Sequence, residues 1–153
     1  WADAVEVGAL DQLQARARYA HRATITVRTT DLNYGGHLGN DRLLSLVHEA
    51  RVAFLAAAGF TELDCGGVSL IMADAAIAYR GEAFAGDELL FETAAGEFGR
   101  LGFRLLHRVT RTTDGAVIAL VETGMVCFDY EGRRPVAVPD AVRAGLEDHP
   151  DAD

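Results

Sequence analysis

The spacing of apolar residues changes near residue 60, and this change limits the folds that the chain can adopt. Over residues 41–59 the apolar side chains recur at helical spacing and form one broad stripe. From residue 67 to residue 129 they instead alternate or run together, as they do in strands. We therefore expect one long helix over residues 41–59, with Asn40 as its N-cap and Gly59 at its end. The stripe consists of Leu43, Leu46, Val47, Ala50, Ala53, Phe54 and Ala57.

Five segments have the pattern of strands. Alternation at residues 22–30 predicts a half-buried strand before the helix, and longer strands are predicted at 67–79, 87–97, 101–111 and 116–129. Gly99-Arg100 and Asp114-Gly115 mark the turns between the last three of them. The segment 67–79 is almost wholly apolar, which predicts a central strand buried on both faces. One apolar helix among antiparallel strands is typical of an α+β fold, here a curved five-stranded sheet wrapped around the helix.

The chain has 153 residues, the length of about one domain. Residues 1–20 are expected to form a polar lead-in, and residues 131–153 a tail. The tail begins with a turn at 131–135 and includes a short helix near 140–146. We find no internal repeat in the sequence, so a single domain over residues 1–153 is the simplest organisation.

Composition and charge exclude several classes of function. The formal net charge of −9 disfavours nucleic acid or an anionic membrane as a partner. All 14 basic residues are arginine, which excludes a lysine Schiff base. No apolar run approaches the roughly 18 residues that would span a bilayer. Cys65 and Cys127 lack the spacing of a zinc site or a disulfide framework, so we expect reduced thiols in a cytoplasmic protein.

The ten residues before the predicted helix read Asp31-Leu-Asn-Tyr-Gly-Gly-His-Leu-Gly-Asn40. Their glycines allow the backbone to approach a ligand closely. The first N–H groups of the following helix lack intrahelical acceptors and carry a partial positive charge. We therefore expect the backbone amides of Gly39 and Asn40 to form an oxyanion hole, which stabilises a carbonyl oxygen that gains negative charge during a reaction.

This motif and the order of elements resemble the hotdog fold, and more narrowly the 4-hydroxybenzoyl-CoA thioesterase family. The resemblance covers about residues 22–145. It implies an acyl-CoA thioesterase, which hydrolyses an acyl-CoA thioester to a carboxylic acid and free coenzyme A without a metal or redox cofactor. It also implies a homodimer or a dimer of dimers. The residues that match the family pattern are Asp31, Asn33, Gly36, His37, Gly39, Asn40 and Glu49-Ala50-Arg51.

One residue departs from the family pattern. Asn33 occupies the position of an aspartate that serves in the family as nucleophile or general base, and an amide cannot take a proton from water. The resemblance implies Glu49 as the catalytic carboxylate, at the edge of the apolar stripe where partial desolvation would raise its pKa. Asp31 is the alternative base. Asn33 and His37 are expected to hold the thioester oxygen or the attacking water.

Charged residues on the predicted strands are candidates for binding coenzyme A or for buried ion pairs. Arg100, at a predicted hairpin tip, resembles the basic position that contacts coenzyme A phosphates in the family. Arg104 and Arg108 lie on one face of the next strand and are expected to widen this basic patch. Asp74 lies within an apolar strand and needs a partner if it is buried, and Arg80, Arg51 or a group at a subunit interface could provide it.

Two other functions remain open. A dehydratase of the same fold would carry its catalytic histidine in a different loop pattern, usually with proline nearby, and no proline lies near His37. A non-catalytic acyl-CoA binding protein would tolerate Asn33 because it performs no chemistry. Hydration of crotonyl-CoA would identify the dehydratase, and release of free thiol from a panel of acyl-CoAs would exclude the non-catalytic protein.

Overall fold

The computed structural model describes residues 21–146, so the predicted lead-in and residues 147–153 of the predicted tail lie outside the described residues. The predicted strands, the long helix and the tail helix are all present, with ends within four residues of the predicted ones. In chain order the elements are β1 (His21–Thr26), the 3-10 helix η1 (Thr29–Asp31), α2 (Asn40–Ala57), β2 (Ser69–Tyr79), β3 (Glu88–Gly96), β4 (Gly102–Arg111), β5 (Val117–Asp129), β6 (Arg134–Pro135) and α3 (Asp140–Leu146).

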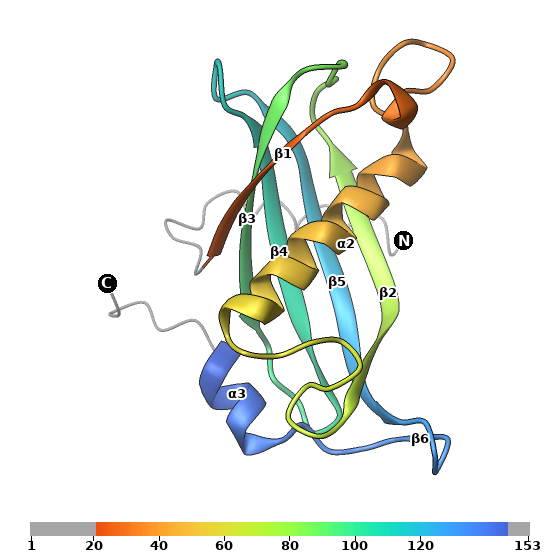
Figure 1. Cartoon of the computed structure of the whole chain (residues 1–153), viewed down its shortest axis with the longest axis vertical. Coiled ribbons are helices and arrows are strands. Elements are labelled where there is room, and N and C mark those ends of the chain that lie inside the picture. Colours follow the sequence, from red (N-terminus) through yellow and green to blue (C-terminus); the bar gives the residue numbers. More distant parts are fainter. Residues whose placement is uncertain (1–20, 147–153) are drawn as a thin grey trace.

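The strands form one antiparallel sheet that curves around α2 (Figure 1). Their order is β1-β3-β4-β5-β2, and the short β6 pairs with the end of β5. The prediction that residues 67–79 form a central strand buried on both faces is wrong for a single copy of the chain. β2 is the last strand of the sheet, and residues 72–75 are exposed. Its alanine-rich sequence therefore borders an unpaired edge.

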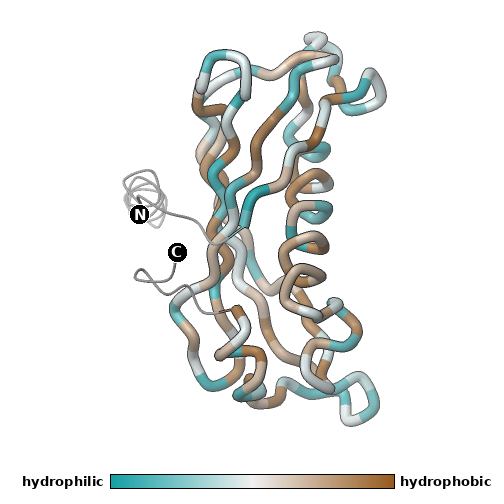
Figure 2. Tube along the Cα trace, turned by 60° about the vertical axis from the view of Figure 1, so that its left-hand side comes forward, coloured by the Kyte–Doolittle hydropathy of each residue, from teal (hydrophilic) through white to brown (hydrophobic). Residues whose placement is uncertain are grey.

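Helix α2 forms a layer on one side of the sheet (Figure 2). Its buried residues are Leu43, Leu46, Val47, Ala50, Arg51, Phe54 and Leu55. Burying each large apolar side chain of this set contributes about 1.5–3 kcal/mol to folding. The predicted stripe is therefore confirmed over most of its length, although Ala57 is exposed.

Two polar details of α2 differ from the prediction. Gly39 is the N-cap and makes no side-chain capping hydrogen bond, so the predicted N-cap role of Asn40 is wrong. Asn40 is instead the first helical residue. Arg51 is buried, and its Nε donates to Glu62 Oε1 at 2.8 Å, which compensates the cost of burying its charge.

A buried histidine lies in the sheet. His107 of β4 is completely buried, and its Nδ1 lies 2.9 Å from Thr93 Oγ1 on the neighbouring β3. Burial, with the charge of Arg51 as a smaller cause, lowers the pKa of His107 to about 3. The imidazole is therefore neutral in the folded protein at neutral pH.

Candidate active site

The predicted motif before α2 forms a tight turn. An isolated bridge pairs Leu32 with Leu38, and Asn33 N–H donates to His37 O at 2.9 Å. Gly36 has a φ of 77°, a backbone conformation that glycine adopts without a steric penalty. The turn therefore brings the side chains of Asn33 and His37 to one side of the start of α2.

The structure gives Asp31 a different environment from that expected of a base. Asp31 is buried, with 1% of its surface exposed. Its Oδ2 accepts from the Arg28 N–H at 2.9 Å and from Arg28 Nε at 3.2 Å, and its Oδ1 accepts from Arg28 Nη2 at 3.1 Å. These hydrogen bonds lower the pKa of Asp31. Both oxygens are thus engaged in a local ion pair, which argues against the predicted role of Asp31 as the alternative base.

The two amides predicted to form an oxyanion hole differ in their availability. The Gly39 N–H donates to Asp31 O at 3.0 Å and is therefore already engaged. Asn40 begins the helix and belongs to the first turn, where N–H groups lack intrahelical acceptors. Asn40 also lines a pocket, whereas Gly39 does not. Of the predicted pair, only Asn40 belongs to the lining of the pocket, so its amide is the remaining candidate for the oxyanion hole.

This pocket lies at the start of α2 and has a volume of about 140 Å³. One part of its wall is apolar, with Leu38, Leu43, Ala83 and Ile118. The polar part consists of His37, Asn40, Tyr79 and Glu82. A cavity of this size can hold a group as large as benzene. The pocket is therefore suited to a small apolar group attached to a polar one.

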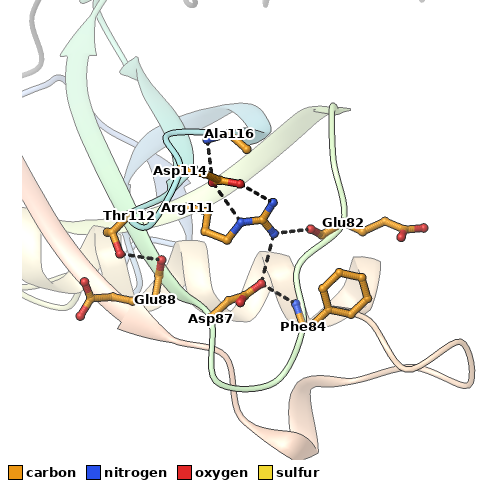
Figure 3. A network of polar contacts seen from close by, with 8 residues as sticks. All are labelled: Glu82, Phe84, Asp87, Glu88, Arg111, Thr112, Asp114 and Ala116. Carbon is orange, nitrogen blue, oxygen red and sulfur yellow. Dashed lines mark hydrogen bonds and ion pairs between the residues drawn. The ribbon is translucent and has the colours of Figure 1, made fainter.

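The loop between β2 and β3 forms one side of the pocket and is fixed by Arg111 of β4 (Figure 3). Arg111 Nη1 donates to Glu82 O at 3.0 Å and to Asp87 Oδ2 at 3.2 Å, and Arg111 also pairs with Asp114. Asp87 Oδ2 in turn accepts from the Phe84 N–H at 2.9 Å. The loop thus has a defined backbone position, although it contains no helix or strand.

Sequence reasoning did not identify Glu82, which faces the predicted His37 across the pocket. Leu38 N–H donates to Ala83 O at 2.7 Å, so the main chains beside the two residues are joined directly. His37 Nε2 lies 3.9 Å from Glu82 Oε1. On its other side, His37 Nδ1 lies 3.4 Å from Asn33 Nδ2. The sequence gives little indication that Glu82 belongs to the site, because the residue lies in a loop where apolar residues show no regular spacing.

The structure separates Glu49 and Arg100 from the pocket. Glu49 is exposed rather than partly desolvated as predicted, and it lies nine residues beyond Asn40 in α2. That spacing corresponds to about 13 Å along the helix axis. Arg100 is exposed in the turn between β3 and β4, at the end of the sheet opposite the start of α2 (Figure 1). Within one copy of the chain, neither side chain lines the pocket.

The arginines that were predicted to extend a basic patch are paired with carboxylates. Arg104 Nη2 lies 2.8 Å from Asp74 Oδ1 and 2.8 Å from Glu122 Oε2. Arg108 Nε donates to Glu92 Oε1 at 3.0 Å. The prediction that Arg104 and Arg108 widen the patch of Arg100 is therefore wrong, because neighbouring strands supply compensating negative charge. The same contacts make Arg104, which was not among the predicted candidates, a partner of Asp74.

Within residues 21–146 the structure offers neither a metal site nor a membrane-spanning helix. No group of three or more His, Cys, Asp or Glu residues in this range is arranged to hold a metal ion. No helix in the same range combines the length and the apolar composition needed to cross a membrane.

Comparison with known proteins relates the chain to a thioesterase-like superfamily. The family model of the thioesterase-like superfamily matches residues 27–146. A 1,4-dihydroxy-2-naphthoyl-CoA thioesterase from Synechocystis is 19% identical, with a TM-score of 0.74 over 81% of this chain and 93% of that one. A thioesterase from Thermus thermophilus, solved with coenzyme A and Zn, is 26% identical, with a TM-score of 0.75 over 86% and 94%.

A thioesterase superfamily protein from Jannaschia sp. CCS1 is 20% identical, with a TM-score of 0.75 over 90% of this chain and 87% of that one. A comparison with curated protein sequences finds no match. Together with the sheet order and the central helix, the matches confirm the predicted hotdog fold.

Proposed function

Because this chain belongs to the thioesterase-like superfamily, we propose that it hydrolyses acyl-CoA thioesters to a carboxylic acid and free coenzyme A. The observation that carries the proposal is the pocket at the start of α2, which combines a first-turn amide with polar side chains and an apolar wall. The coenzyme A bound to the Thermus thermophilus thioesterase supports this class of substrate.

In the proposed complex, the thioester carbonyl oxygen accepts a hydrogen bond from the Asn40 N–H. This amide is at the positive end of the helix dipole, so it stabilises the negative charge that develops when water attacks the carbonyl carbon. The apolar wall formed by Leu38, Leu43, Ala83 and Ile118 receives the acyl group. No step of this reaction requires a metal or redox cofactor.

We also propose that the working unit is a homodimer or a dimer of dimers, in which a second copy pairs along β2. The edge of β2 is open, and residues 72–75 are exposed there. Antiparallel pairing of two β2 strands would bring the Arg100 end of one copy towards the α2 start of the other. Arg100 would then meet coenzyme A phosphates, and Glu49 would lie beside the partner's site.

A cytoplasmic location is part of the proposal. Cys65 and Cys127 are free and buried, as is usual for thiols of proteins from reducing compartments. Burial raises the pKa of the Cys65 thiol to about 12, so this thiol is unreactive at neutral pH.

A free-thiol assay over aromatic, short-chain and long-chain acyl-CoAs tests the proposed hydrolysis. We expect release of coenzyme A from at least one class, at a rate that increases with the amount of enzyme, and no release in the buffer control. Tight binding of every acyl-CoA without thiol release would support a non-catalytic acyl-CoA binding protein. The observation that favours this alternative is Asn33, which stands where the family pattern has a catalytic aspartate. Hydration of crotonyl-CoA without thiol release would instead indicate a dehydratase.

A further inference from the structure

We propose that Glu82 is the general base of this site, and that Asn33 and His37 form a chain of hydrogen-bond donors directed towards its carboxylate. The inference rests on the proposed thioester hydrolysis and supplies the carboxylate that position 33 lacks.

The hydrogen bonds of Asn33 fix the direction of this chain. Gly35 N–H donates to Asn33 Oδ1 at 2.9 Å, so the other end of the side chain, the Nδ2 amide, faces His37. An amide NH₂ group can only donate, and therefore His37 Nδ1 must accept. A neutral imidazole that accepts at Nδ1 carries its proton on Nε2. The Nε2–H lies on the side of Glu82 Oε1, 3.9 Å away.

The separation between His37 and Glu82 leaves the carboxylate free to bind water. The 3.9 Å between His37 Nε2 and Glu82 Oε1 is too long for a direct hydrogen bond. The side chain of Glu82 is 65% exposed and is therefore accessible to water. In contrast, both oxygens of Asp31 are bonded to Arg28. Glu82 is thus the carboxylate in the pocket wall that remains available as a proton acceptor.

The backbone of Glu82 is fixed while its side chain is directed away from the anchoring arginine. Figure 3 shows the Glu82 carbonyl meeting Arg111 and the carboxylate extending in the opposite direction. The bond between Leu38 N–H and Ala83 O holds the loop against the turn that carries His37. Other titratable groups at this end are Tyr79, whose hydroxyl donates to Asn40 O at 3.3 Å, and Asp41 in the first turn of α2.

The proposed step balances protons and bonds. Glu82 takes a proton from water as the water oxygen bonds to the thioester carbonyl carbon, and the carbonyl oxygen becomes an oxyanion held by the Asn40 N–H. When this intermediate collapses, the C–S bond breaks and the sulfur leaves as the coenzyme A thiolate. The thiolate takes the proton from Glu82, which returns to its carboxylate form.

The test compares the wild type with Glu82→Gln in the free-thiol assay. Loss of a general base is expected to lower kcat by about 10²-fold to 10⁴-fold, with little change in KM. The decrease of kcat/KM on the acidic side of the pH profile should be present in the wild type and missing in Glu82→Gln. Glu88→Gln, a matched change of an exposed glutamate at the start of β3, should leave rate and pH profile unchanged.

Chemical rescue distinguishes a base from a structural residue. Hydroxylamine attacks a thioester as a neutral amine, without prior removal of a proton, so it should restore thiol release by Glu82→Gln above the enzyme-free background. An unimpaired Glu82→Gln variant, or an impaired one that hydroxylamine does not rescue, would overturn the role of Glu82 while leaving thioester hydrolysis in place. Absence of thiol release by the wild type over the whole panel would instead defeat the proposed function itself.

Discussion

Asn33 illustrates how one amide determines the protonation of a neighbouring ring. A carboxylate at position 33 would accept a hydrogen bond from His37 Nδ1–H, whereas the amide donates a hydrogen bond to Nδ1. The two cases place the imidazole proton on opposite nitrogens. The departure from the family pattern therefore changes which side of His37 can donate, and it makes Glu82 a better placed acceptor than it would otherwise be.

We predict that neutral His37 carries its proton on Nε2 in the wild type and that Asn33→Asp moves this proton to Nδ1 or makes the ring cationic. The ¹⁵N chemical shifts of the imidazole distinguish these forms, and a His37→Gln variant assigns the signals. A wild-type ring protonated on Nδ1 would contradict the hydrogen-bond directions described above.

The buried His107 leads to a separate prediction, which concerns how the stability of the fold depends on pH. Its folded pKa of about 3 lies below the value of 6.5 for an unperturbed histidine. Between these two values the unfolded state binds one more proton than the folded state, so stability falls as pH decreases. The contribution is about 1.4 kcal/mol per pH unit.

Urea unfolding of the wild type and of His107→Asn between pH 6.5 and pH 4.5 measures this term. Asparagine retains a hydrogen-bonding group near Thr93 and cannot be protonated in this range. We expect the free energy of unfolding of the variant to change less steeply with pH, by a slope that corresponds to about one bound proton. Equal slopes in the two proteins would show that His107 is not the group responsible.

At the scale of elements, the loop between β2 and β3 depends on β4 for its position. Arg111 bonds to the loop at Glu82 O and Asp87, and a single main-chain bond joins Ala83 to Leu38. Loops without regular structure usually open more readily than helices and strands. Here the ionic contacts of Arg111 oppose such opening.

We predict that Arg111→Gln loosens this loop. The Leu38 amide should then exchange its hydrogen with solvent several-fold faster, because its acceptor Ala83 O lies in the loop. Thiol release should fall in the same variant. Arg134→Gln, a change at an exposed arginine in β6, serves as the control and should alter neither measurement. An unchanged exchange rate for Leu38 in Arg111→Gln would contradict the anchoring role.

The helix and the strands could be predicted because each has a hydrophobic period that sequence alone displays. The helical stripe from Leu43 to Phe54 is buried as expected, and the hairpin turn at Asp114-Gly115 connects β4 and β5. Strand order and charge pairing could not be predicted, because they depend on contacts between distant segments. Arg104, for example, meets Asp74 only because β4 and β2 both flank β5.

The candidate site was predictable only in part for the same reason. The turn that carries Asn33 and His37 is local, and its motif identified it. Glu82 reaches His37 through a loop whose position is set by Arg111, which no local pattern reveals. The engagement of the Gly39 amide by Asp31 O is likewise a detail of the turn geometry.

At the scale of the whole molecule, the open edge of β2 predicts association between copies. A positive charge near the middle of this strand would face its own counterpart if two β2 strands pair antiparallel. We therefore expect Ala75→Arg to yield monomers in sedimentation velocity experiments, and the matched surface change Ala137→Arg to leave the assembly intact. A wild-type protein that sediments as a monomer at micromolar concentration would contradict the proposed assembly.

β2 runs directly into the loop that carries Glu82, so the edge and the reaction site share one continuous segment. Any neighbour that steadies the strand also steadies the residues that follow it. Turnover per molecule should then rise with enzyme concentration and decline on dilution. The concentration of the protein would in that way regulate the rate of hydrolysis per molecule, without an effector molecule.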